Sequence, residues 1–444
     1  MTRALLVRAL AVRGLAVRGL LMLMFASTCA LAQLDTATTS YTVSGLRVIH
    51  RRTNTSIVVA NLYLLGGVRQ ATARTAGLES FLLAVSERGT QKYPKAVLRR
   101  AMARTGSEII VQPHDDWTLM AVRTTTAELD STWAIFADRL MHPALDSADV
   151  EFVRAQLVAG LRQRFDGPDA TLDFLADSIA YAGHPYALST VGTEASVSRL
   201  TVAQLRAYAK EQMVTSRMLL VVVGDVAREK VESLVRATIG RLAAGSYVWT
   251  MPDTLATAAA DVVFAQRSLP TNYMQGYFAG PGANSPDAPA LRVAAAILSG
   301  RLFTEIRSRR NLTYAVNANF RDRGLTSLGL YVTTTAPDTT IALMRAEVQH
   351  LKTVALDTDL LRPLVQQFIT EYFLDNETIT AQADFLARAE LYRGDFHAAR
   401  RFVSELRAVT GADVQRVAQR YLKNVRWAYV GDPARIRRER LLTF

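Results

Sequence analysis

The feature of this sequence that most constrains its fold is an internal repeat. Two apolar segments, 219–225 and 426–432, each end in a Gly-Asp turn, and the two turns lie 207 residues apart. Each segment follows a helical pattern that begins with a threonine and has an amide or acid three residues later: Thr201 with Gln204, and Thr410 with Asp413. This spacing is typical of a helix N-terminus. Because cap, helix, strand and turn recur in one order, we expect two homologous lobes.

The hydrophobic periodicity predicts an α+β fold in which each lobe is a mostly antiparallel sheet with helices packed on it. In the first lobe, strand patterns occupy 47–66 and 119–124, and helical patterns occupy 77–87 and 128–141. In the second lobe, the corresponding strands are 273–278 and 328–335, and the helices are 288–309 and 340–356. We expect an N-terminal lobe at 33–245, a linker rich in small polar residues at 246–260, and a C-terminal lobe at 261–444.

The first 32 residues have the pattern of a secretory signal peptide. Four arginines precede an apolar run at 20–25, and Ala30-Leu31-Ala32 offers small residues for cleavage before Gln33. The run is short for a membrane span, although a retained anchor is the alternative. We therefore expect an exported, periplasmic chain that is soluble after cleavage, with no stable membrane insertion.

Removal of the leader would also change the charge and the thiol content. Its four arginines account for the fall in formal net charge from +12 to +8. The basic excess is spread along the chain without a nucleic-acid-binding motif, so we expect no nucleic-acid partner. The only cysteine, Cys29, lies in the leader. Lipid attachment there is an alternative, but Thr28 is large for the preceding position. The remaining chain has no thiol and hence no disulfide.

The segment 76–90, AGLESFLLAVSERGT, resembles the active-site helix of the insulinase/pitrilysin-type (M16) metallopeptidases, which have the insulinase/LuxS-like metallohydrolase fold. In that family two histidines four residues apart bind zinc, and a glutamate between them activates water. The resemblance assigns these positions to Ser80, Leu83 and Ala84, and assigns the third zinc ligand, a glutamate on a later helix, to Gly160. None of these four residues can serve, so we expect no metal and no catalytic residue in this chain.

No other metal site is indicated by the histidines. Those after the leader have no partner histidine three or four residues away. His114-Asp115-Asp116 could bind a cation, but we interpret it as a solvated loop. His184-Pro185-Tyr186 matches a family segment near a turn and is interpreted as structural.

The resemblance extends over nearly the whole chain after the leader. It includes the segments 183–186 and 191–193, and, in the second lobe, 298–307 and 311–314. The second-lobe segments match the family pattern R-x₆-Y, which identifies Arg307 and Tyr314. In the family this pair reaches towards the substrate, where a guanidinium and a phenol can donate hydrogen bonds to a peptide carbonyl. The alternatives are that Tyr314 is a core residue, sharing a strand face with Val316, Ala318 and Phe320, and that Arg307 is a solvated helix end.

Loss of the zinc ligands together with retention of the Arg/Tyr pair resembles the non-catalytic subunits of the processing-peptidase-like bacterial members of this family. The resemblance implies a heterodimer in which a homologous subunit carries the zinc and this chain helps to bind peptides or unfolded segments. The chain would not be an enzyme on its own. The alternatives are a structural scaffold with no role in proteolysis, and a homodimeric peptide-binding or chaperone-like protein.

Overall fold

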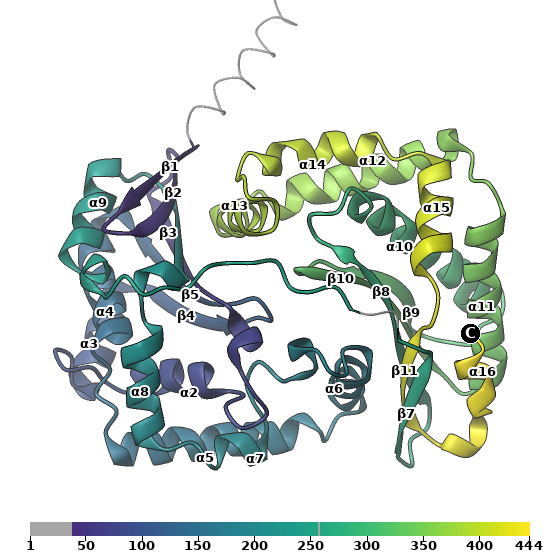
Figure 1. The fold of residues 1–444 in the computed structure, drawn as a ribbon, viewed down its shortest axis with the longest axis horizontal. Helices are drawn as coiled ribbons and strands as arrows, with labels where there is room; N and C mark the ends of the chain where they lie inside the picture. Colours follow the sequence, from purple (N-terminus) through teal and green to yellow (C-terminus); the bar gives the residue numbers. More distant parts are fainter. Residues whose placement is uncertain (1–37, 256–257) are drawn as a thin grey trace, which may run out of the picture.

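The chain forms two lobes, each built on one β-sheet with helices packed against it (Figure 1). The computed structural model describes residues 38–255 and 258–444, so the predicted leader and Cys29 lie outside the described residues. The predicted α+β class is confirmed. Within the described residues, no helix combines the length and the apolarity needed to cross a bilayer.

The first sheet has six strands in the order β1-β2-β6-β3-β5-β4. They are β1 (Thr38–Val43), β2 (Leu46–Arg52), β3 (Ile57–Leu65), β4 (Glu108–Pro113), β5 (Trp117–Thr125) and β6 (Met218–Gly224). Neighbouring strands are antiparallel except for β2 and β6, which are parallel. The pattern at 47–66 therefore forms two strands rather than one, because β2 and β3 pair with opposite sides of β6 in opposite directions.

The second sheet has five strands in the order β7-β11-β8-β10-β9. They are β7 (Asp261–Gln266), β8 (Asn272–Gly282), β9 (Val316–Arg321), β10 (Leu325–Thr334) and β11 (Arg426–Gly431). Only β7 and β11 are parallel. This order and these directions repeat those of β2-β6-β3-β5-β4, so the predicted pair of homologous lobes is confirmed.

The helices occur singly or in runs between these strands and after the last one. Before the second sheet they are α2 (Leu78–Ser86), α3 (Lys95–Thr105), α4 (Leu129–Met141), α5 (Ser147–Arg164), α6 (Pro168–Ala180), α7 (Glu194–Val197), α8 (Val202–Gln212) and α9 (Arg228–Ala237). The later ones are α10 (Ala288–Leu302), α11 (Pro337–Thr353), α12 (Thr358–Asp375), α13 (Ile379–Arg393), α14 (Ala398–Arg407), α15 (Gly411–Tyr421) and α16 (Arg438–Leu442). The helix predicted at 288–309 is α10 followed by a π-helical turn, η6 (Phe303–Ser308). Residues 246–255 and 258–260, within the predicted linker, contain no helix or strand.

The repeat that predicted the two lobes has the expected local structure. Helices α8 and α15 both begin with a capping box, in which a threonine hydroxyl and the side chain three residues later each accept a backbone N–H. The strands that follow end at Gly224 and Gly431, both with a φ of 152°. A Cβ on Gly224 would lie 2.7 Å from the carbonyl oxygen of Ile57. Only glycine fits such a turn without strain.

Each sheet is covered on one face by its own lobe and on the other by a helix from the other lobe. The first sheet packs against α2, α4 and α8 on one face and against α13 on the other. The second sheet packs against α10, α11 and α15 on one face and against α6 on the other. Figure 1 shows α13 and α6 between the two sheets. Since each sheet buries apolar side chains under a helix that the other lobe supplies, the lobes form one folded unit.

Candidate functional site

The beginning of α2 is fixed by a close crossing with the segment 189–196. Gly77 has a φ of 87°, and a Cβ there would lie 2.6 Å from the carbonyl oxygen of Val191. Gly192 has a φ of 81°, and its Cβ would lie 2.5 Å from the carbonyl oxygen of Ala76. The two glycines therefore allow the backbones to touch, which sets the position of the helix on which the resemblance places the zinc motif.

The four motif positions lie on α2 and α5, and their side chains offer no zinc site. The Ser80 hydroxyl donates to the carbonyl oxygen of Thr190 at 2.9 Å. Leu83 is 1% exposed in the hydrophobic core, and Ala84 packs against the same core. Gly160 is exposed, and a Cβ on it would meet no atom within 4 Å. Since zinc in proteins takes Cys, His, Asp or Glu ligands, these residues do not fit the metal that the family carries.

The one acid on α2 is also committed to a structural contact. Glu79 accepts hydrogen bonds from Arg217 at 2.7 Å and from the hydroxyl of Tyr208 at 2.8 Å. The Arg217 side chain is 1% exposed. Such a buried ion pair holds its carboxylate in place against Arg217. Across the described residues, no three His, Cys, Asp or Glu side chains are grouped so that they could hold a metal ion.

Arg307 and Tyr314 do lie together. The guanidinium carbon of Arg307 lies 4.9 Å from the centre of the Tyr314 ring and 5.0 Å from that of Phe303. Both aromatic side chains are exposed, Tyr314 by 82% and Phe303 by 44%. Arg307 and Phe303 belong to the π-helical turn η6, a local geometry that is rare in proteins and frequent at functional sites.

The alternative that Tyr314 is a core residue is wrong, because β9 begins only at Val316 and Tyr314 points into solvent. The backbone before it is tied to the end of β10. Thr334 donates to the carbonyl oxygen of Leu312 at 2.8 Å, and Thr313 donates to that of Ala315 at 2.8 Å and also to that of Thr333. These hydrogen bonds fix the backbone on both sides of Tyr314, and its side chain points outwards.

Arg307 differs from the arginines around it in having no anionic partner. Arg301 pairs with Glu347 at 2.7 Å, and Arg309 and Arg310 both pair with Glu305. The guanidinium of Arg307 makes no hydrogen bond or ion pair within residues 38–255 and 258–444. Its donors are therefore available to a ligand.

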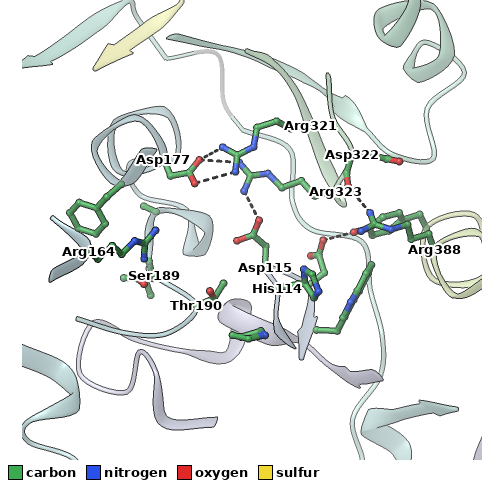
Figure 2. A pocket seen from close by; sticks show the side chains of 17 residues that line it. His114, Asp115, Arg164, Asp177, Ser189, Thr190, Arg321, Asp322, Arg323 and Arg388 are labelled. Carbon is green, nitrogen blue, oxygen red and sulfur yellow. Dashed lines mark hydrogen bonds and ion pairs between the residues drawn. The ribbon is translucent and has the colours of Figure 1, made fainter. Parts of the chain in front are cut away.

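A second site, which the sequence did not indicate, lies between the lobes. A cavity of about 360 Å³ is lined by the ends of β4 and β9, by α6 and α13, and by the segment 187–190 (Figure 2). In Figure 2, Arg321 and Arg323 from the second lobe both reach Asp177 on α6, and Arg323 also pairs with Asp115. Ion pairs thus cross this cavity from one lobe to the other.

Beside the cavity, Asp116 joins the lobes through a buried set of hydrogen bonds. Its carboxylate is 1% exposed and accepts from the hydroxyl of Tyr186 at 2.5 Å, the hydroxyl of Tyr392 at 2.9 Å and the backbone N–H of Gly324 at 2.9 Å. The interpretation of His114-Asp115-Asp116 as a solvated loop is therefore wrong. The structural interpretation of His184-Pro185-Tyr186 agrees with the Tyr186 contact and with the hydrogen bond from the Tyr186 N–H to the His184 ring.

Two ionisable rings at the cavity, His114 and Tyr392, favour their neutral forms. Burial lowers the pKa of His114, so its imidazole is neutral at pH 7. Burial and then the nearby Asp116 raise the pKa of Tyr392 well above its ordinary value. Beside these neutral rings, the ion pairs of Arg321 and Arg323 with Asp177, and of Arg323 with Asp115, join the lobes.

A second internal repeat in the sequence could have revealed this junction. Asp-Phe-Leu-Ala occurs at 173–176 on α6 and at 384–387 on α13, and each copy is followed five residues later by a tyrosine, Tyr181 and Tyr392. The two copies thus lie on α6 and α13, the helices that each cover the sheet of the other lobe. The residue after each copy is an acid in one, Asp177, and a base in the other, Arg388, and both side chains line the cavity.

Comparison with known proteins gives matches along most of the chain. Residues 47–194 match the sequence model described as insulinase (peptidase family M16), and residues 199–364 match the one described as peptidase M16 inactive domain. The chain is 24% identical over 423 residues to cytochrome b-c1 complex subunit 1 of Caenorhabditis elegans, covering 90% of this chain and 89% of that protein. It is also 24% identical over 369 residues to an uncharacterized zinc protease of Mycobacterium bovis, covering 80% and 84%.

Solved structures show the same fold. A peptidase M16 inactive domain from Pseudomonas fluorescens superposes with a TM-score of 0.80 at 17% identity, covering 89% of this chain and 98% of that one. A protease from Helicobacter pylori gives the same TM-score and identity, with 89% and 99% covered.

Proposed function

The chain belongs to the insulinase (M16) peptidase family, and we propose that it is a non-catalytic subunit which binds peptides or unfolded segments for a zinc-bearing homologue. The observation that carries the proposal is the unpaired guanidinium of Arg307 held against the exposed ring of Tyr314. It occurs in a chain whose zinc-motif positions carry Ser80, Leu83, Ala84 and Gly160.

The chemistry of the pair suits this role. A peptide carbonyl gains negative charge as water attacks it, and hydrogen-bond donors fixed near its oxygen stabilise that charge. The Arg307 guanidinium and the Tyr314 hydroxyl are such donors, and both are exposed enough to meet a ligand carried by a second subunit. The zinc and the general base would belong to that subunit. We place the pair of subunits in the periplasm, because the sequence begins with a signal-like segment.

The test combines the purified chain with a zinc-bearing homologue encoded in the same genome. The chain alone should contain no stoichiometric zinc and cleave no peptide, whereas the mixture should cleave. Arg307→Ala should lower kcat of the mixture by about 10²–10³-fold, as loss of an oxyanion donor does elsewhere. The matched control is Arg309→Ala, since Arg309 directly follows the turn that carries Arg307 but pairs with Glu305. Zinc-dependent cleavage by this chain alone would contradict the proposal.

The alternative is a scaffold with no role in proteolysis. It is favoured by the similarity to a subunit of the cytochrome b-c1 complex, a protein named as part of a larger assembly. A scaffold would form a complex whose peptidase activity, if any, is the same with Arg307 and with Arg307→Ala.

A further inference from the structure

Phe303 is the third member of the cluster formed with Arg307 and Tyr314, and the sequence resemblance gave it no role. It lies four residues before Arg307 in η6, so the widened turn brings both side chains to the same side. The guanidinium carbon lies nearly equally far from the two ring centres, at 5.0 Å for Phe303 and 4.9 Å for Tyr314.

The exposure of Phe303 calls for an explanation. Phe303 is 44% exposed, and the hydrophobic core beneath η6 is instead filled by Leu302 and Ile306. What Phe303 does contact is the guanidinium of Arg307, which lies over its ring and has no carboxylate partner among the described residues, whereas Arg309 and Arg310, directly after the turn, both pair with Glu305. An arginine without such a partner would spread over many rotamers.

We propose that Phe303 is a positioning residue that holds the Arg307 guanidinium for the ligand of the Arg/Tyr pair. A cation is attracted to the face of an aromatic ring, while its N–H groups stay free to donate at its edge. The two rings thus restrict Arg307 without using up its donors. A carboxylate partner would restrict it equally well but would occupy those donors. This inference rests on the proposed function, because it concerns the same ligand.

The first experiment measures the position of Arg307 without any partner subunit. The isolated chain is treated with phenylglyoxal, and the modification rate of each arginine is followed by peptide mass mapping. Phe303→Leu keeps an apolar side chain but removes the ring, so the rate at Arg307 should rise about 2- to 5-fold, the loss expected for an exposed cation–π contact. Phe303→Tyr keeps the ring and should restore the original rate.

A matched control comes from the first lobe. Phe152 is 45% exposed and lies 4.3 Å from the guanidinium carbon of Arg88. Phe152→Leu should alter the modification of Arg88 and leave that of Arg307 unchanged. An unchanged rate at Arg307 in Phe303→Leu would overturn the proposal, and so would an equal rise in Phe303→Tyr, because the ring would then not be what matters.

The second experiment uses the complex with the zinc-bearing homologue. Phe303→Leu should lower kcat about 2- to 5-fold with KM little changed, and Phe303→Tyr should restore kcat. If Arg307→Ala lowers kcat but Phe303→Leu does not, the positioning role is overturned while the proposed function stands. If Arg307→Ala itself has no effect on the complex, the proposed function fails, and the modification rates still decide whether Phe303 holds Arg307.

Discussion

Replacement of Asp116 should destabilise both lobes at once. Its carboxylate is 1% exposed and accepts three hydrogen bonds, two from tyrosine hydroxyls and one from a backbone N–H of the second lobe. Asp116→Ala leaves three buried donors without an acceptor, each at a cost of about 1–3 kcal/mol. Because the three share one site, the total should be less than their sum. We expect a loss of about 4–6 kcal/mol, a large part of the 5–15 kcal/mol typical of a folded protein.

The assay is urea unfolding of the isolated chain at pH 7, followed by far-UV circular dichroism and tryptophan fluorescence. Asp116→Asn keeps the shape and an acceptor oxygen but loses the charge, so it should cost less, about 1–3 kcal/mol. Asp130→Ala is the control, since Asp130 is an exposed partner of Lys230 and such pairs contribute at most about 1 kcal/mol. The reasoning is refuted if Asp116→Ala costs less than 1 kcal/mol, or if it shifts the unfolding of one lobe only.

Other predictions concern the motif positions, the histidines and the helix exchange. Gly160→Ala should raise the free energy of unfolding by about 0.5–1 kcal/mol, since the added methyl group meets no atom; a loss in urea unfolding would contradict this. Leu83→Glu should lower the free energy of unfolding by about 3–5 kcal/mol in the same assay, because the carboxylate would be buried without a partner. A urea midpoint equal to that of the wild type would refute this prediction. Burial lowers the pKa of His50 and His114 below 6.5, so the unfolded chain takes up protons first as the pH falls. The melting temperature should then decrease from pH 7.5 to 5.5, and less so in His114→Gln; equal slopes would argue against this. A fragment of residues 38–245 should show no cooperative melting transition, because it lacks α13. A sharp transition would show that the first lobe folds without this helix.

The lobes could be predicted because their signals are local. A threonine with its partner three residues later and a glycine at the end of an apolar strand each act within a few residues, and both recur in order. The arrangement at Asp116 could not be predicted in this way. Its tyrosine partners lie 70 and 276 residues away, and a run of histidine and two acids has the composition of a surface loop.

The position of Tyr314 in the Arg/Tyr site also could not be predicted from local sequence patterns. Alternation at 314, 316, 318 and 320 predicted one strand face for all four residues, but the strand begins at Val316. The hydrogen bonds of Thr313 and Thr334 turn Tyr314 outwards, and hydrophobic periodicity does not detect them. The proximity of Arg307 and Tyr314 was implied by resemblance alone, whereas the contact with Phe303 required the structure.

The exchange of α6 and α13 between the lobes sets the order in which the chain can complete its folding. The strands of the first sheet end at Gly224, but the helix that covers their second face ends at Arg393. Because the chain is synthesised from the N-terminus onwards, that apolar face stays open to water until most of the second lobe has been made. Contacts over such long stretches of sequence form slowly, and an uncovered sheet is prone to aggregate. A chaperone that covers this face should therefore raise the yield of folded protein most when it binds before residue 393 has been synthesised.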